Sequence, residues 1–246
     1  EILRCLVGSE MCIRDRDKRM VYAADYLERH GFIYKQNIDE SDFVLLPVPV
    51  KKEMLDSLNG KFAFYGKGEY KNGFDYMKDE TYVLKNALLT AEGAVACLEE
   101  NTDYSLIGKN ILIIGYGRIA KALRKILSSY GSNITVCSRS SISKAEAEFD
   151  GVKHISFSEL KNKSDYDIVI NTVPHIVLTK EELTALKKSV LILDLASFPG
   201  GVDTLVAKSL GLKLINGRGM PSVYTQKTAG EIIGESVVNI IKGEKL

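Results

Sequence analysis

At 246 residues the chain is long enough for one large domain or two modest ones. Its composition, 45% hydrophobic and 26% charged with a formal net charge of +1, is that of a globular protein and gives no sign of a nucleic-acid-binding surface or an acidic tail. No apolar run reaches the length that spans a membrane, and no cluster of side chains has metal-ligand spacing.

The first sixteen residues differ in character from the rest of the chain. Residues 5–16 resemble the in-frame translation of a transposase-type sequencing-library adapter. We therefore interpret residues 1–16 as an artefact joined to a fragment, the alternative being a genuine, irregular N-terminus, and expect their deletion to leave the melting temperature unchanged. Without them Cys97 and Cys137 remain, which have neither metal-ligand nor redox-motif spacing. We interpret both as buried thiols of a cytoplasmic protein.

Helical and strand patterns alternate from Asp17 onward. Apolar residues at helical spacing follow Asp17, and apolar runs at 43–50, 61–66 and 82–86 predict buried strands. This alternation is typical of a parallel α/β sheet. Because the first helix has no strand before it, we expect the first strand to be missing. We interpret residues 17–103 as a truncated, flavodoxin-like α/β domain with a linking helix.

The linking helix is expected to begin near residue 89, with Thr90 as its N-cap. Its first turn would then face the space between two domains, so Thr90 and Gly93 are candidates for binding substrate. Glu92 lies in the same turn. A carboxylate is favourable at the start of any helix, so Glu92 fits a structural role as well as a catalytic one.

A glycine turn between a buried strand and an amphipathic helix organises the rest of the chain. Residues 111–114 are apolar, Gly115-x-Gly117-x-x-Ala120 follows at once, and apolar residues then recur at helical spacing. In a dinucleotide site the first glycine allows a tight turn, the second lets pyrophosphate approach the backbone, and the alanine lets helix and strand pack closely. The predicted phosphate-binding residues are Gly115, Tyr116, Gly117, Arg118 and Ile119.

The sequence after the next strand, residues 133–137, bears on the choice of cofactor. A site that selects NAD usually places Asp or Glu there to bind the ribose 2′-hydroxyl. This chain has Ser138, Arg139 and Ser140, which offer a guanidinium and hydroxyls to a 2′-phosphate. We expect NADP rather than NAD, with a solvated turn and a surface arginine as the alternative.

The apolar patterns predict four further strands and a last helix, at residues 154–157, 167–171, 190–195, 213–216 and 228–241. With the glycine turn they make residues 104–226 a doubly wound, parallel-sheet Rossmann domain for NAD(P), and residues 227–246 a helix returning to the N-terminal domain. Ligands of such sheets lie at the carboxyl ends of the strands. The residues there that we expect to contact the cofactor are Asn171, Thr172, Val173, Pro174, Asp194 and Ala196.

Motifs at these strand ends resemble a known family. Residues 171–174 (Asn-Thr-Val-Pro), 193–203 (Leu-Asp-Leu-Ala-Ser-x-Pro-Gly-Gly-x-Asp) and 227–230 (Lys-Thr-Ala-Gly) are similar to the A subunits of dipicolinate synthases. Residues 90–93 and 17–19 match as well, so the resemblance runs from residue 17 to the end of the chain. It implies an architecture like that of the two-domain 2-hydroxyacid and alanine dehydrogenases.

The resemblance also implies a function. Such an enzyme would use NADP or NAD to oxidise a hydroxylated tetrahydrodipicolinate from the lysine pathway to pyridine-2,6-dicarboxylate, the calcium chelator of bacterial endospores. A flavoprotein-like B subunit is the implied partner, the assembly is expected to be oligomeric, and the compartment is the mother-cell cytoplasm. Neither nucleic acid nor membrane is an expected partner.

The implied reaction needs proton-transfer groups and donors for two carboxylates. His175 is the one histidine at an expected ligand-facing strand end, with an exposed loop histidine as the alternative. Lys227 fits a surface position on the last helix as well as a binding role. We take Glu92, His175 and Ser197 as candidate catalytic residues. The candidate substrate-binding residues are Thr90, Gly93, Gly200, Gly201, Lys227 and Thr228.

Two other functions remain open from the sequence. A D-2-hydroxyacid dehydrogenase would place an arginine after the strand at 190–195 and a histidine further on. This chain has Ala196, Ser197 and Phe198 there, and no histidine after His175. A non-catalytic nucleotide-binding subunit that supports its partner would show the same motifs.

Overall fold

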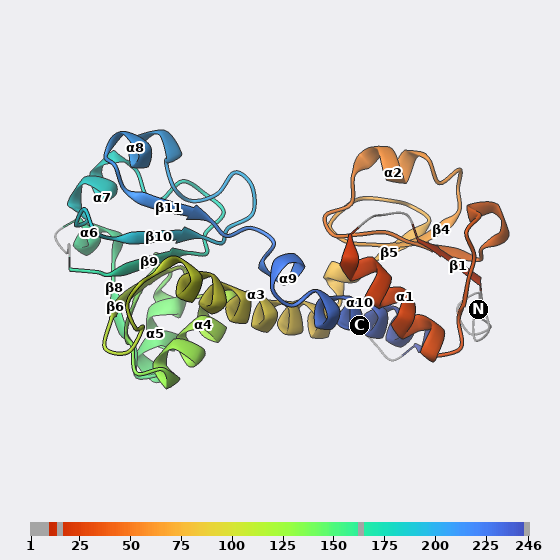
Figure 1. The fold of residues 1–246 in the computed structure, drawn as a ribbon, viewed down its shortest axis with the longest axis horizontal. Coiled ribbons are helices and arrows are strands. Elements are labelled where there is room, and N and C mark those ends of the chain that lie inside the picture. Colours follow the sequence, from red (N-terminus) through yellow and green to blue (C-terminus); the bar gives the residue numbers. More distant parts are fainter. Residues whose placement is uncertain (1–9, 14–16, 162–164, 244–246) are drawn as a thin grey trace. The chain divides into compact units, whose positions relative to one another are not determined.

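The structure, a computed structural model, describes residues 10–13, 17–161 and 165–243. It divides into two compact units, one formed by Glu1–Asn86 with Pro221–Leu246 and the other by Ala87–Met220. We call these the terminal unit and the central unit. Each is built on a parallel β-sheet with helices against it, so the predicted α/β class is confirmed (Figure 1).

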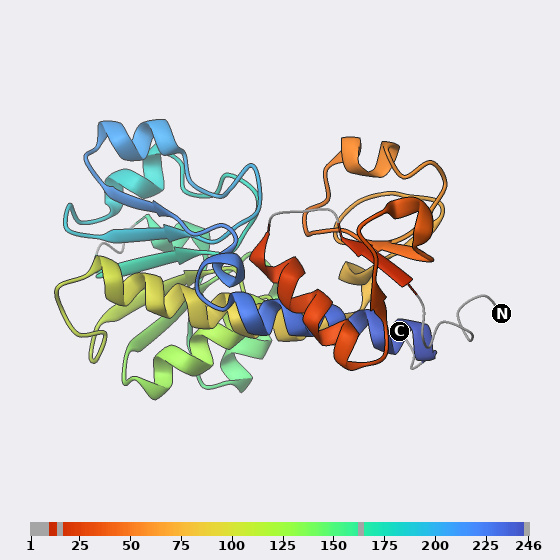
Figure 2. The ribbon, with the colours of Figure 1, turned by 45° about the vertical axis from the view of Figure 1, so that its right-hand side comes forward.

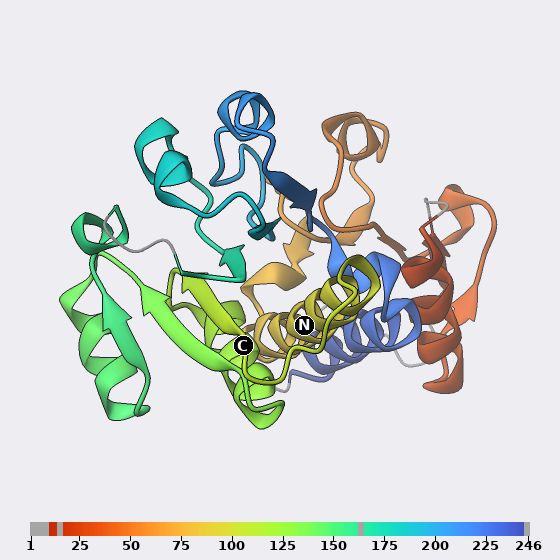
Figure 3. The same cartoon turned by 60° about the vertical axis from the view of Figure 1, so that its left-hand side comes forward.

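The central unit carries a six-stranded parallel sheet. After the second part of α3 (Glu80–Asn101), its elements are β6 (Asn110–Ile114), α4 (Arg118–Ser129), β7 (Asn133–Cys137), α5 (Ser141–Phe149), β8 (Lys153–Ile155), α6 (Phe157–Leu160), β9 (Ile168–Asn171), α7 (Lys180–Ala185), β10 (Leu191–Asp194), α8 (Thr204–Ser209) and β11 (Lys213–Asn216). The strand order is β11-β10-β9-β6-β7-β8, and α4 and α5 lie on the opposite face from α7 and α8 (Figure 1, Figure 3). Crossovers therefore run in opposite directions from β6, which is the switch point where such sheets bind ligands.

The core of the central unit explains why its middle strands are continuous apolar runs. Every residue of β9 and β10 is buried, as are Ile111–Ile114 of β6. Side chains on one face, including Leu112 and Ile192, pack with Leu183 of α7 and Ala207 of α8. A strand covered by helices on both faces has no solvent side, so the sequence shows no polar alternation.

The terminal unit carries a five-stranded parallel sheet in the order β2-β1-β3-β4-β5. Its elements are β1 (Glu10–Ile13), α1 (Lys18–Arg29), β2 (Ile33–Tyr34), β3 (Phe43–Leu45), α2 (Lys52–Asp56), β4 (Phe62–Tyr65), β5 (Gly73–Asp75), the start of α3, and, after α9 (Met220–Val223), α10 (Gln226–Lys242). Helices α1 and α10 lie side by side (Figure 2). Arg29 pairs with Glu231 at 3.3 Å, and Lys85 of α3 pairs with Glu235 at 2.5 Å.

The start of α1 accounts for the Asp17-Lys-Arg19 motif. The Asp17 carboxylate accepts the backbone N–H of Arg19 at 2.9 Å and so caps the helix. The largely buried Arg19 guanidinium donates to the same carboxylate and to the Val48 carbonyl oxygen at 2.9 Å. Burial disfavours the ionised carboxylate, but the hydrogen bonds and charge of Arg19 outweigh it and lower the pKa of Asp17.

The segment predicted as a strand at 82–86 is wrong. These residues continue α3, which begins at Glu80, and the Asp79 side chain accepts the Thr81 backbone N–H at 2.9 Å. Tyr82 is buried with its ring 5.2 Å from that of Tyr76. A β-branched and aromatic composition favours a strand, but the cap and this packing decide the helix. Consequently Thr90 lies ten residues inside α3 and is not its N-cap.

Residues 10–13 contradict the expectation that residues 1–16 take no part in the fold. They form β1, which pairs with β2 on one side and β3 on the other, and Met11 has no exposed surface. The first strand of the sheet is therefore present. The rest of residues 1–16 lies outside the described part of the chain.

Truncating Met11 tests this placement. We expect Met11→Ala to cost about 2–5 kcal/mol of unfolding free energy, because it leaves a cavity in a central strand. The exposed Val21 of α1 provides a control, and Val21→Ala should stay within about 0.5 kcal/mol. Thermal or denaturant unfolding measures both. If both variants lose equally little unfolding free energy, Met11 does not pack in the sheet, and residues 1–16 are an appended segment as the sequence suggests.

Both cysteines in the central unit are free and buried, as predicted. Burial, and then the negative charges of Glu159 and Glu182, raise the pKa of the Cys137 thiol to about 12. The Cys137 side chain is therefore a neutral part of the core at physiological pH.

Candidate functional site

The turn after β6 requires a glycine at its first position. Gly115 has a φ of +92°, and its N–H donates to the Cys137 carbonyl oxygen at 2.8 Å. A Cβ at this position would lie 2.5 Å from the Thr172 hydroxyl oxygen, which itself donates to the Ile114 carbonyl oxygen. Conformation and close approach of the neighbouring strand both exclude a side chain.

Gly117 is different, because nothing inside the protein requires it to be a glycine. It is the N-cap of α4 with a φ of −87°, and a Cβ there would meet no atom within 4 Å. No side chain caps α4, and its first turn has no acidic residue. The N–H groups of a helix start form an anion site. The turn therefore fits a pyrophosphate lying against Gly117, where a side chain would occupy the space of the ligand.

The side chain of Tyr116 is part of the protein interior. Its hydroxyl donates to the Asp150 carboxylate, which also pairs with Arg124 at 3.2 Å, and the Lys121 ammonium lies 5.6 Å from the ring centroid. Burial, and then Asp150, raise the pKa of Tyr116 to about 12. Only the backbone of Tyr116 therefore remains available for the predicted contact with the cofactor. Arg118 is exposed and Ile119 half-buried in the first turn of α4.

The segment after β7 presents one charge. Ser138 is buried and its hydroxyl pairs with His154 Nε2 at 2.9 Å, while Ser140 caps α5 by accepting the Ser143 N–H at 3.4 Å. The exposed Arg139 guanidinium lies 5.4 Å from the Phe157 ring centroid. Burial, and then the charge of Lys144, lower the pKa of His154, so its imidazole is neutral at pH 7. Arg139 therefore carries the only charge of the predicted 2′-phosphate trio.

Asn171 and Asp194 hold the carboxyl ends of β9 and β10 together. The fully buried Asn171 donates from Nδ2 to Asp194 Oδ1 at 2.8 Å and to the Val173 carbonyl at 3.0 Å, and its Oδ1 accepts the Val173 N–H at 3.1 Å. Asp194 also accepts the N–H of Ala196 at 3.2 Å and of Gly201 at 3.0 Å. Both side chains thus shape the edge from within. The other residues predicted to contact the cofactor there are the partly exposed Thr172 and Val173, the exposed Pro174 and the buried Ala196.

The backbone N–H groups of Gly200 and Gly201, predicted to bind a substrate carboxylate, are both paired inside the protein. The Gly200 N–H donates to the Ser197 carbonyl oxygen at 2.9 Å, and the Gly201 N–H is taken by Asp194. A Cβ on Gly201 would lie 2.1 Å from Asn171 Nδ2. This glycine therefore serves the close packing of the buried Asn171–Asp194 pair.

Arg218 is a residue of this edge that sequence reasoning missed. It follows β11, donates from Nε to the Ala196 carbonyl oxygen at 3.1 Å and from Nη2 to the Pro199 carbonyl oxygen at 2.8 Å. Its guanidinium carbon lies 5.8 Å from the Phe198 ring centroid. The sequence signal that could have identified Arg218 is a cationic residue between two glycines, directly after the strand predicted at 213–216.

The other candidate residues are dispersed. Thr90 and Gly93 are buried inside α3, where helix N–H groups are already paired, whereas Glu92 is exposed on the same helix. His175 and Ser197 are exposed in the loops after β9 and β10. The structure therefore does not bring Thr90, Glu92 and Gly93 together on one helix start.

Lys227 and Thr228 lie at the start of α10, in the terminal unit. Lys227 borders a surface pocket of about 760 Å³ together with Asp25, Glu28 and Glu231. Lys227 therefore lies on the surface of the α1–α10 pair, beside acidic residues. That setting favours the surface interpretation over binding a substrate carboxylate.

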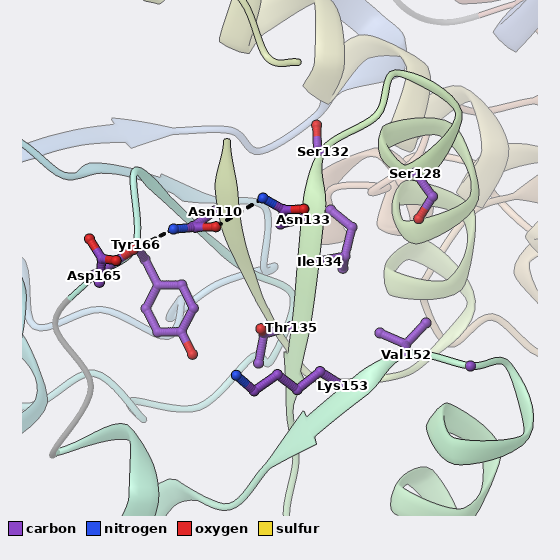
Figure 4. Close-up of a pocket in the computed structure, with 11 residues that line it drawn as sticks. Asn110, Ser128, Ser132, Asn133, Ile134, Thr135, Val152, Lys153, Asp165 and Tyr166 are labelled. Atoms are coloured by element: carbon purple, nitrogen blue, oxygen red, sulfur yellow. Dashed lines mark hydrogen bonds between the residues drawn. The ribbon is translucent and has the colours of Figure 1, made fainter. Parts of the chain in front are cut away.

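Another pocket, of about 750 Å³, lies at the amino-terminal edge of the central sheet (Figure 4). Asn110 donates to the Asp165 carbonyl at 3.2 Å and accepts from Asn133 at 3.2 Å. This edge is opposite the glycine turn, since Asn110 and Asn133 begin strands whose far ends carry Gly115 and Ser138. Ligands of doubly wound sheets bind at the other edge, so we place the site at the glycine turn.

Comparisons with known proteins agree with this placement. Residues 88–197 match the NAD binding domain of the D-isomer specific 2-hydroxyacid dehydrogenases. The A subunit of dipicolinate synthase from Bacillus subtilis (strain 168) is 33% identical over 157 residues, which are 63% of this chain and 53% of that protein. The resemblance to the A subunits of dipicolinate synthases is confirmed.

Solved structures of dipicolinate synthase A subunits share the fold. The Bacillus halodurans protein has a TM-score of 0.85 at 22% identity, covering 96% of this chain and 98% of that chain. The Bacillus subtilis protein has a TM-score of 0.83 at 24% identity, covering 98% of this chain and 99% of that chain. The chain spans about half the length of the curated dipicolinate synthase protein that it matches. The central unit thus has a Rossmann-like fold, and its match to an NAD binding domain supports a nicotinamide cofactor.

Metal ligands and membrane spans can both be assessed within the described residues. No three His, Cys, Asp or Glu side chains among them come together in a group that could hold a metal ion. No helix in this part of the chain is long and apolar enough to cross a membrane.

Proposed function

We propose that the chain acts as the A subunit of a dipicolinate synthase, oxidising a hydroxylated tetrahydrodipicolinate to pyridine-2,6-dicarboxylate with NADP as acceptor. The observation that carries the cofactor part is the open Cβ position of Gly117 at the uncapped start of α4. The similarity to the Bacillus subtilis dipicolinate synthase protein supports the substrate. That protein is named as a subunit, which supports a partner subunit, and we propose a B subunit in the mother-cell cytoplasm of a spore-forming bacterium.

Different residues of the central unit bind the parts of the cofactor and carry out the steps of the reaction. The N–H groups at the start of α4 bind the pyrophosphate, Arg139 binds the 2′-phosphate, and the exposed loops after β9 and β10 orient the reacting ring. When bound, the cofactor supplies a hydride acceptor. The substrate loses water, a hydride and one proton, which makes the ring aromatic. We assign the proton transfers to His175 and Glu92, and a hydrogen bond to the substrate to Ser197.

Arg139 should set the cofactor preference. We expect Arg139→Asp to lower the ratio of NADP affinity to NAD affinity at least about tenfold, because it removes a charged hydrogen bond to the 2′-phosphate and supplies an acceptor for a 2′-hydroxyl. Calorimetric titration with both cofactors measures the ratio. The exposed Arg29 of the terminal unit is a control, since Arg29→Asp should leave the ratio unchanged. An unchanged ratio in Arg139→Asp would make NAD the better assignment.

The function is tested with the purified chain and its purified B partner, assayed separately and mixed for dipicolinate formation. Glu92→Gln and Ser197→Ala should lose activity while retaining NADP binding. Full activity of both variants would place the chemistry elsewhere. Dipicolinate formation by the B partner without this chain would reduce the chain to a nucleotide-binding support.

A further inference from the structure

The guanidinium of Arg218 is fixed at the carboxyl edge of the central sheet. Two of its N–H groups are held by the carbonyl oxygens of Ala196 and Pro199, at 3.1 and 2.8 Å. Gly200 has no side chain to fill the space beside it, since a Cβ there would lie 2.7 Å from Arg218 Nη2. A guanidinium has five N–H donors and Arg218 is exposed, so donors beyond these two bonds remain for a ligand.

The guanidinium of Arg218 forms no ion pair within the described residues. None of their carboxylates forms an ion pair with it, and the nearby Asp194 spends both oxygens on Asn171, Ala196 and Gly201. A planar fork of donors matches the two oxygens of a carboxylate. The edge therefore presents an oriented cation whose neighbouring carboxylate, that of Asp194, is already engaged by three hydrogen bonds.

Phe198 adds an apolar surface next to this cation. Its side chain is 83% exposed, and the ring centroid lies 5.8 Å from the guanidinium carbon of Arg218. Exposing a phenylalanine ring to water has no structural benefit, whereas a ring face can stack against a flat ligand. A fixed guanidinium beside an open aromatic face is chemistry that suits a planar ring bearing a carboxylate.

The position of the pair agrees with a substrate role. Arg218 and Phe198 follow β11 and β10, and the Asp194 carbonyl oxygen joins the two strand ends by accepting the Gly217 N–H at 2.8 Å. In the sheet order, β10 is separated from β6 by β9 alone. The pair and the glycine turn thus share one edge, with β10 two and β11 three strand spacings, or about 10 and 14 Å, from β6.

We propose that Arg218 binds a carboxylate of the substrate and that Phe198 packs against the substrate ring. This inference rests on the proposed function and names the residues that recognise its substrate class. Arg218 replaces Gly200, Gly201 and Lys227 as the carboxylate donor expected from the sequence.

The test is binding without turnover. The probes are pyridine-2,6-dicarboxylate and its uncharged analogue pyridine-2,6-dicarboxamide, titrated calorimetrically into the full chain with saturating NADP. The native chain should bind the dicarboxylate at least about tenfold more tightly than the diamide. Arg218→Gln should remove this preference while leaving the diamide and NADP affinities within twofold. Arg218→Lys should retain part of the preference, and Phe198→Leu should weaken both probes alike.

The outcomes separate this inference from the proposed function. If Arg218→Gln weakens both probes equally, or leaves the preference intact, the inference is overturned, because Arg218 then only holds the loop. A native chain without any preference overturns it as well. Should Arg218→Gln fail to fold, the partial preference of Arg218→Lys decides. Absence of NADP binding, with an Arg218-dependent preference in titrations without cofactor, would leave the inference standing and remove the proposed function.

Discussion

Replacing Gly117 by Asp should abolish NADP binding while leaving the central unit folded. A carboxylate at this position occupies the open space at the start of α4 and repels the pyrophosphate. Its φ of −87° is open to any residue, and Asp is a better N-cap than Gly, so helix stability should rise by a few tenths of a kcal/mol. We expect at least a hundredfold loss of affinity by calorimetry, with an unchanged or higher melting temperature.

Gly117→Asn separates the effect of the negative charge on NADP binding from the effect of the added side-chain volume. Asn caps a helix as well as Asp and has nearly the same size, but it carries no charge. We expect an affinity between those of the native chain and Gly117→Asp. Unchanged NADP affinity in both variants would mean that the nucleotide does not lie against this turn, and the proposed site would be wrong.

Removing the Asp194 carboxylate should have the largest effect on stability. Asp194→Ala leaves three buried donors without a partner, on Asn171, Ala196 and Gly201. At about 1–3 kcal/mol for each unsatisfied group, we expect a loss of about 4 kcal/mol or more. Unfolding by urea measures it. The same change should disorder the loop that orients Arg218, and so weaken substrate binding before the protein unfolds.

Asp203 supplies the matched control. It lies at the end of the same loop but accepts one N–H, from Val206 at 3.0 Å, as the N-cap of α8. Asp203→Ala should therefore cost only about 1 kcal/mol. Similar losses from the two variants would show that the Asn171–Asp194 pair contributes no more than an ordinary helix cap.

The elements that could be predicted from the sequence are those whose signal is local. Buried strands of the central sheet read as apolar runs, and the glycine turn combines three signals within a dozen residues. Helix α3 was misread because a cap at Asp79 and the packing of Tyr82 on Tyr76 override a strand-like composition. Strand β1 is excluded by the sequence analysis because residues 5–16 resemble an adapter translation. In the structure it nevertheless pairs with both β2 and β3.

The site residues divide in a similar way. Gly115 and Gly117 follow from spacing, because backbone conformation and helix termini are local properties. The roles of Gly200, Gly201 and Arg218 depend on pairs that the fold brings together across β9, β10 and β11. No spacing rule reports that an N–H already has a partner or that two backbone carbonyl oxygens fix a guanidinium. Those facts become visible only when three strand ends are placed side by side.

The buried thiols of the central unit make its opening chemically observable. A thiol with a pKa of about 12 and no exposed surface does not react with alkylating reagents until the surrounding sheet opens. Cys137 is the last residue of β7, immediately before the segment that holds Arg139, and Cys97 lies in α3. Once Cys5 and Cys12 are replaced by serine, the rate at which Cys97 and Cys137 are alkylated measures unfolding of the central unit alone. A dinucleotide bound at that edge should slow it in proportion to its occupancy.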